Sequence, residues 1–150
     1  MERLWIMLAG YFKKIGMRRF TVMAIGNLFL GMGISIFKLS GLGNDPFSGM
    51  VMALSDRTGI TYALFLVMVN AVLFLYEITA GRKLIGAGTL INAFLLGYIV
   101  TFFYDIWLTF IGTPEQMIQR VITVLTGVII TSFGVSLYQY PNVGVAPYDS

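Results

Sequence analysis

The sequence predicts an all-α integral membrane protein with four transmembrane helices, short re-entrant or broken helices and an incomplete inverted repeat of about 100 residues. Three observations predict this fold: the composition, the length of the apolar stretches and a self-match of the chain. Of the 150 residues, 57% are apolar and 11% are charged, with a mean hydropathy of +0.83. A soluble domain is about 45–50% apolar and about 25% charged. The composition therefore excludes a soluble enzyme domain, a disordered tail and a secreted disulfide scaffold.

Residues 1–18 are predicted to form an amphipathic helix at the membrane interface. Apolar residues recur there at helical spacing, at Leu4, Leu8, Tyr11 and Ile15. Basic residues lie in or next to the same segment, namely Arg3, Lys13, Lys14, Arg18 and Arg19. Most of this charge follows the apolar residues, and no small-residue cleavage site comes after it, unlike a cleaved signal peptide. Because the basic residues adjoin a spanning segment, a lipid surface is favoured over nucleic acid as their partner.

Four stretches are long and apolar enough to cross a bilayer, which requires about 20 residues of helix. They are residues 20–39, 60–80, 84–112 and 117–140. Residues 46–56 are also apolar, but 11 residues of helix reach only about half of the bilayer, so this segment is predicted to be re-entrant. Five Lys and Arg residues precede the first span, which places the N-terminus in the cytoplasm by the positive-inside rule.

An internal repeat appears when the chain is shifted over itself by 101 residues. Residues 19–49 and 120–150 then match without gaps, and six positions are identical: Arg19/Arg120, Gly26/Gly127, Gly33/Gly134, Ser35/Ser136, Gly43/Gly144 and Pro46/Pro147. This match divides the chain into a first repeat, residues 19–112, and the start of a second, residues 117–150, with a second re-entrant helix beginning at 146–150. The period predicts a whole protein of about 210 residues.

Glycines within the first span have a packing interpretation. Gly26 and Gly33 are seven residues apart, so they lie on one face of the helix and allow a second helix backbone to approach closely. One repeat holds three spans, an odd number, so the second repeat begins on the opposite side of the membrane. Inverted repeats whose broken helices meet near the midplane are typical of transporters. A purely structural duplication that builds a stable bundle is the alternative.

Two short motifs follow the matched spans. They are Gly41-Leu42-Gly43-Asn44-Asp45-Pro46-Phe47 and Val143-Gly144-Val145-Ala146-Pro147-Tyr148-Asp149, and Gly31-Met32-Gly33-Ile34-Ser35 precedes the first. With these motifs the chain resembles the YczE/YitT-type bacterial membrane proteins, in which an LG-x-x-P-F/W-D pattern follows a glycine-rich span. Ser48 departs from that pattern, because the second copy has Asp149 at its position. The resemblance implies a multi-pass protein of the bacterial cytoplasmic membrane and leaves the substrate open.

The candidate substrate-binding residues lie at the two breaks and near the outer ends of the spans. They are Lys38, Asn44, Asp45, Pro46, Asp105, Pro147 and Asp149. Ionisable groups inside a membrane are costly, which makes them functional candidates. Lys38, Asp45 and Asp105 are expected to form one outer cluster in which Lys38 neutralises a carboxylate, either as a vestibule for a cation, a proton or a zwitterion, or as residues that reach water at the interface. Asn27, Asn70 and Asn92 are expected to join helices by hydrogen bonds or to line a polar path.

Catalysis is not expected. Cysteine and histidine are absent, which removes a thiol nucleophile and the commonest general base and metal ligand. Tyr104-Asp105 together with Gly41–Asp45 superficially resemble intramembrane aspartyl proteases, but Asn44 is inserted before the aspartate and the two motifs stand in reverse order. No catalytic residue, metal site or cofactor is predicted.

The function predicted from these features is that of a small-solute transporter or solute-binding membrane protein, with its site between two broken helices. A non-transporting scaffold or assembly factor that supports another enzyme is the alternative. The expected partners are the lipid bilayer, an unidentified small molecule or ion, and a second copy of the chain or a partner subunit, without nucleic acid.

Overall fold

The computed structural model describes residues 16–80 and 86–144, which form five helices and no strand. In chain order they are α2 (Met17–Ser40), α3 (Pro46–Thr58), α4 (Tyr62–Ala80), α5 (Ala87–Phe110) and α6 (Met117–Gln139). Within these residues, α2, α4, α5 and α6 are each long and apolar enough to cross a membrane. The predicted all-α membrane fold with four spanning helices is therefore confirmed.

Several helices begin or end next to a glycine, at positions a few residues away from the predicted bounds. α2 begins at Met17 after Gly16, so the last two residues of the predicted interfacial helix belong to the first long helix. Residues 1–15, the rest of that predicted segment, lie outside the described residues. α2 and α3 are each followed by a glycine in the left-handed conformation, Gly41 and Gly59. α3 therefore ends at Thr58, two residues after the predicted end at residue 56.

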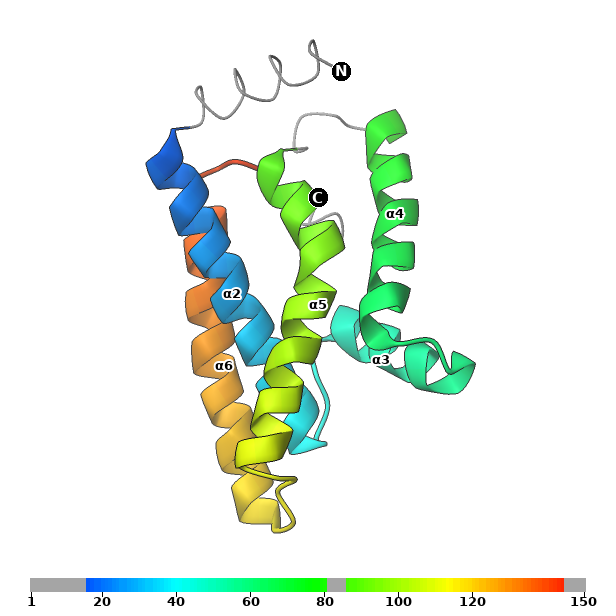
Figure 1. Cartoon of the computed structure of the whole chain (residues 1–150), viewed down its shortest axis with the longest axis vertical. Helices are drawn as coiled ribbons and strands as arrows, with labels where there is room; N and C mark the ends of the chain where they lie inside the picture. The colour runs from blue at the N-terminus through cyan, green and yellow to red at the C-terminus, as the bar shows by residue number, and fades with distance from the viewer. Residues whose placement is uncertain (1–15, 81–85, 145–150) are drawn as a thin grey trace.

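The most extensive helix packing joins α2 and α6, which run antiparallel along one side of the molecule (Figure 1). Each of four glycines in this pair lies directly against the opposite helix, in the pairs Gly26–Tyr138, Leu30–Gly134, Gly33–Thr131 and Phe37–Gly127. As the number on α2 rises, the number on α6 falls by the same amount, so the four pairs share one antiparallel register. The expectation that Gly26 and Gly33 admit a second helix is confirmed, and the partner is the helix that matches α2 in sequence.

α5 covers a second face of α2, and α4 packs on α5 (Figure 1). The Asn92 side-chain amide donates a hydrogen bond to Asn27 Oδ1 at 3.1 Å, and Trp107 Nε1 donates to Ser35 Oγ at 3.0 Å. α2 therefore has long helices on two sides, whereas the extensive contact of α6 with a long helix, within the described residues, is with α2. Half of the most apolar segment of α2 is consequently buried, against 17% for α6.

α3 lies crosswise beside the N-terminal end of α4 (Figure 1). Its buried residues are Ser48, Val51 and Ser55, which are spaced along one helix face. Val51 joins the main hydrophobic cluster, whose fully buried members come from all five helices: Leu30, Ile34, Val51, Tyr62, Leu66, Leu96, Val100 and Tyr138. This cluster fixes α3 against the spanning helices and so positions the chain segment that precedes it.

Candidate functional site

The two breaks predicted from the repeat have positive φ angles at the same two matched positions. Gly41 and Gly43, after α2, have φ angles of 64° and 117°. Their counterparts after α6, Asn142 and Gly144, have φ angles of 51° and 110°. A positive φ favours glycine, and asparagine is the side chain that tolerates it best. The sequence match is thus accompanied by positive φ at the same two positions, with Asn142 standing where the first break has Gly41.

The first break ends in a capped helix start. Asp45 is the N-cap of α3, and its Oδ1 accepts a hydrogen bond from the Ser48 amide at 3.0 Å. Asn44 Oδ1 accepts from the Asp45 amide at 2.9 Å, which holds the turn ahead of the cap. Pro46 occupies the first turn of α3, where its missing N–H leaves no hydrogen bond unmade. Asn44, Asp45 and Pro46 thus form the capped start of α3.

Lys38 lies between two tyrosine rings and makes no ion pair with either predicted carboxylate. Its Nζ is 4.3 Å from the ring centroid of Tyr104 and 5.7 Å from that of Tyr62, a cation–π arrangement. Asp45 is exposed in the loop, and Asp105 is exposed on α5. The expectation that Lys38 neutralises one of these carboxylates is therefore wrong for this structure. Successive residues on a helix point about 100° apart, so the turn that brings Tyr104 to Lys38 directs Asp105 outward.

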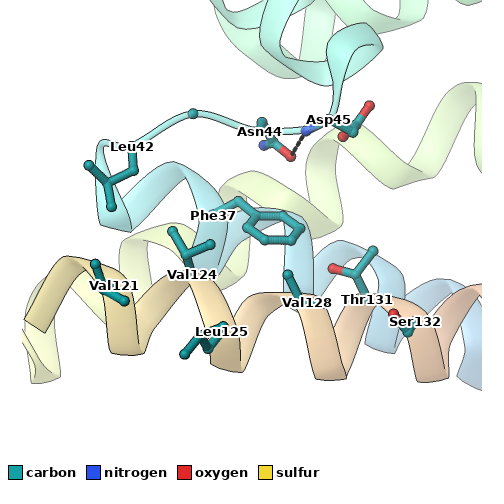
Figure 2. A pocket seen from close by; sticks show the side chains of 11 residues that line it. Phe37, Leu42, Asn44, Asp45, Val121, Val124, Leu125, Val128, Thr131 and Ser132 are labelled. Atoms are coloured by element: carbon teal, nitrogen blue, oxygen red, sulfur yellow. Dashed lines mark hydrogen bonds between the residues drawn. The ribbon is translucent and has the colours of Figure 1, made fainter.

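A groove of about 510 Å³ borders the first break (Figure 2). One wall is the break itself, including Asn44 and Asp45, and the opposite wall is α6. The α6 wall presents apolar side chains over most of its length and ends in two hydroxyl residues, in the order Val121, Val124, Leu125, Val128, Thr131 and Ser132. The groove is therefore mostly apolar along its α6 wall. The carboxylate of Asp45 and the amide of Asn44 lie on the opposite rim, which the first break forms.

The second break is closely packed. Its Val143 carbonyl accepts a hydrogen bond from the Gly88 amide at 3.0 Å, and Gly144 lies against the backbone of Gly86. The N-terminal end of α5 thus fits into this break. Two further predicted site residues, Pro147 and Asp149, lie outside the described residues.

The three intramembrane asparagines act as links between helices. Asn27 and Asn92 join α2 to α5, and the Asn70 side-chain amide donates to the Ala93 carbonyl at 3.3 Å, which joins α4 to α5. Of the two interpretations offered by the sequence, these contacts favour interhelical hydrogen bonding. The two tyrosine rings around Lys38 were missed, because Tyr62 and Tyr104 lie 42 residues apart and only the packing of α4 on α5 and of α5 on α2 brings them together.

Four candidate spanning helices, two of which form a glycine-mediated pair, define a multi-pass α-helical membrane protein. Within that class the chain belongs to a family of unknown function, DUF6198, whose model matches residues 17–150. The predicted resemblance to YczE-type bacterial membrane proteins is thereby confirmed. No solved structure is similar enough to match.

Three curated relatives extend the comparison. The chain is 27% identical over 137 residues to the uncharacterized protein YyaS of Bacillus subtilis, covering 87% of this chain and 65% of the relative. It is 25% identical over 133 residues to the uncharacterized membrane protein YczE of Bacillus subtilis, covering 88% and 60%. An uncharacterized protein of Haemophilus influenzae is 29% identical over 122 residues, covering 80% and 53%. The chain therefore spans between about half and two thirds of the length of these relatives.

Proposed function

We propose that this chain belongs to an inverted-repeat protein of the bacterial cytoplasmic membrane, with a cytoplasmic N-terminus, that binds and transports a small cationic or zwitterionic solute at the Asn44–Asp45 break. The observation that carries the proposal is the repeated break: the same turn follows α2 and α6, which run antiparallel. The two breaks therefore lie toward opposite ends of one helix pair. Two broken helices that enter from opposite sides are the arrangement on which alternating access depends.

Reciprocal contacts between α2 and α6 support the inverted repeat. The 101-residue offset converts the pair Gly26–Tyr138 into the pair Gly127–Phe37, and both pairs are in contact. An interface that maps onto itself in this way has the character of a two-fold axis between the helices. α3 is short enough for the proposed re-entrant element, since its 13 residues span about 20 Å and a bilayer core is about 30 Å thick. It lies crosswise beside α4 (Figure 1).

The chemistry of the first break favours a solute with a positive charge. The carboxylate of Asp45 is exposed beside the groove, and Lys38 is held by its tyrosine rings instead of pairing with it. The Asn44 side chain adds an amide next to the carboxylate. A negatively charged rim with a neutral hydrogen-bonding neighbour suits an ammonium or a metal cation.

A ligand-stabilisation screen tests the proposal. The purified protein in lipid nanodiscs is heated with a panel of amines, amino acids and alkali cations, and a solute that binds raises the melting temperature. Asp45→Asn is expected to abolish that rise while it keeps the helix cap, because asparagine caps as well as aspartate does. Asp56→Asn, a substitution of an exposed aspartate at the other end of α3, is the matched control. If no solute in the panel stabilises the native protein, or if both variants respond like it, solute binding at Asp45 is contradicted.

A scaffold function is the second candidate, and the second break favours it. Gly144 is packed so closely against Gly86 and Gly88 that a side chain there would collide with backbone atoms. A dry, packed break suits a structural element that holds helices together for a partner subunit. Crosslinking in native membranes distinguishes the two functions, because a scaffold is recovered in a stable complex whose yield does not respond to Asp45→Asn.

A further inference from the structure

The α6 wall of the groove corresponds, through the 101-residue offset, to a surface of α2 that is already covered. Val128 matches Asn27, which is buried against Asn92 of α5, and Ser132 matches Gly31, which lies against Ile99 of α5. In α2 these positions are buried, whereas Val128 is 46% exposed. The groove therefore lies where a second helix would stand if α6 were packed as α2 is.

The two breaks also differ in packing: the first break, beside the groove, is open, and the second break is covered by the start of α5. Val143 and Gly144 are in contact with the start of α5 at Gly86 and Gly88, whereas no atom outside its own chain neighbours lies within 4 Å of the position a side chain would take at Gly43. A small hydrophobic cluster at the second break has its counterparts at the groove. It consists of Met23, Val143, Phe20 and Ile91. The counterparts of the first three are Val124, Leu42 and Val121, and all of them line the groove. The counterpart of Ile91 falls beyond residue 150.

We propose that the groove is the docking surface for one transmembrane helix, the second-repeat counterpart of α5. By the same offset this helix occupies roughly positions 188–211 of the full-length polypeptide. The relatives leave room for it, since 35% of YyaS and 40% of YczE lie outside their matches. The inference rests on the inverted repeat proposed above and is independent of whether the protein binds a solute.

The proposal specifies a register and a helix composition. The helix begins against Leu42 and Gly43 with small residues, as α5 begins with Gly86 and Gly88 against the second break. It then crosses α6 at Val128 and Ser132 (Figure 2). The residue that faces Ser132 is smaller than Ile99, because serine occupies the place that glycine has in α2 and the added side chain needs space. Asn44 and Asp45 remain at the rim, beside the start of the docked helix.

The first measurement is the intact mass of the protein isolated from its natural source. The proposal requires a mass above the 16.7 kDa of residues 1–150 by the weight of at least one further spanning segment. A mass of 16.7 kDa overturns it. This readout depends on neither folding nor ligand binding, so it remains decisive where a variant is damaged.

The second measurement uses nitroxide labels on single cysteines, which are unambiguous because the chain has no native cysteine. Labels at Val128→Cys and Ser132→Cys test the groove, and a label at Ile129→Cys, on the lipid-facing side of the same helix turn, is the matched control. In the full-length protein in bilayers, the collision rate with oxygen is expected to be at least threefold lower at 128 and 132 than at 129, with no gain in collisions with a water-soluble nickel chelate.

Each other occupant of the groove gives a distinct result. High oxygen collision at all three labels means that lipid fills the groove, and high nickel collision at 128 and 132 means that water does. Spin–spin broadening between labels at 128 that is lost on dilution with unlabelled protein means that a second copy covers the surface. Any of these results overturns the proposal. Low oxygen collision at 128 together with solute binding that is lost in Asp45→Asn would support both proposals. Low oxygen collision at 128 in a native protein that binds no solute would contradict only the proposed function.

Discussion

Gly26 and Tyr138 meet backbone to backbone where α2 crosses α6. A methyl group at Gly26 would overlap main-chain atoms of Tyr138 and Leu137. Main-chain atoms cannot move aside as a flexible side chain can, so the contact fixes the distance between the two helices. Without a hydrophobic driving force between helices in lipid, close backbone packing of this kind is a main source of association energy. The pair therefore sets the position of both breaks, since each break follows directly from the C-terminal end of one of these helices.

Replacing Gly26 by alanine is expected to destabilise the protein by about 1–3 kcal/mol, because the added methyl group overpacks the helix crossing. The measurement is unfolding by sodium dodecyl sulfate, followed by tryptophan fluorescence. Gly49→Ala is the control: it lies in α3 with no atom within 4 Å of the new methyl group and is expected to be neutral or stabilising by up to about 1 kcal/mol. Equal losses from the two substitutions would contradict the role assigned to the helix crossing.

Gly127→Ala is expected to cost less than Gly26→Ala. The new methyl group at 127 would meet the Phe37 ring at 3.0 Å, and a ring at the edge of the groove can rotate away. We expect a loss below about 1 kcal/mol in the same unfolding measurement, consistent with a modest rotamer adjustment. A loss as large as that at Gly26 would show that the ring is held rigidly and that both ends of the helix pair are equally constrained.

The Asn27–Asn92 hydrogen bond is expected to show coupling in a double-mutant cycle. Each single substitution by leucine leaves the other buried amide without its partner, which costs about 1–3 kcal/mol. The double variant removes both polar groups, so its loss is expected to be smaller than the sum of the single losses, with a coupling energy of about 0.6–1.7 kcal/mol. Simple additivity would mean that the two amides contribute independently.

The contributions of Lys38 and Tyr104 to stability are expected to be coupled. Lys38→Gln removes the cation and Tyr104→Leu removes the ring, and each is expected to cost about 0.5–2 kcal/mol, the range of a cation–π contact. The double variant is expected to lose little more than either one. Tyr104→Phe keeps the ring face and serves as the conservative control, which is expected to retain most of the stability. Measurement of melting temperatures in nanodiscs checks all four variants.

Asp45→Ala is expected to destabilise α3 by about 1 kcal/mol, because the Ser48 amide loses the carboxylate that caps it. Asp45→Asn is expected to keep the cap and to cost a few tenths of that. Hydrogen exchange of the first turn of α3 measures the effect locally. Faster exchange in Asp45→Ala but not in Asp45→Asn would separate the capping role of this residue from its proposed role in solute binding, which requires the negative charge.

The helices themselves were predictable, because each depends on local properties. A bilayer requires about 20 apolar residues in a row, and residues 20–39, 60–80 and 117–140 supply them within a few residues of the observed bounds. The start of α3 was predictable as well, since a glycine-rich turn followed by Asp45 and Pro46 satisfies the first turn of a helix without tertiary help. The third span was predicted to cover residues 84–112, and α5 as described covers Ala87–Phe110.

The site was only partly predictable, because its charges depend on helix rotation. Sequence depth alone placed Lys38, Asp45 and Asp105 near one end of the bundle, but depth does not determine which way a side chain points. In the folded chain Lys38 turns toward Tyr104, and Asp105, one residue further along, points outward. A difference of 100° in rotation thus separates a cation–π contact from the ion pair that depth suggested.

Composition and the length of the apolar stretches by themselves indicated a membrane protein with four spanning helices, and the self-match of the chain predicted two similar turns. Those properties follow from the cost of exposing polar backbone to lipid and from the steric freedom of glycine, which act within a few residues. Only the tertiary structure decided that the two segments matched by the 101-residue offset pack against each other as α2 and α6, and that α5 covers α2 while a groove remains beside α6. Helix pairing in lipid depends on the shapes of two surfaces brought together, and that information is distributed over residues about 100 positions apart.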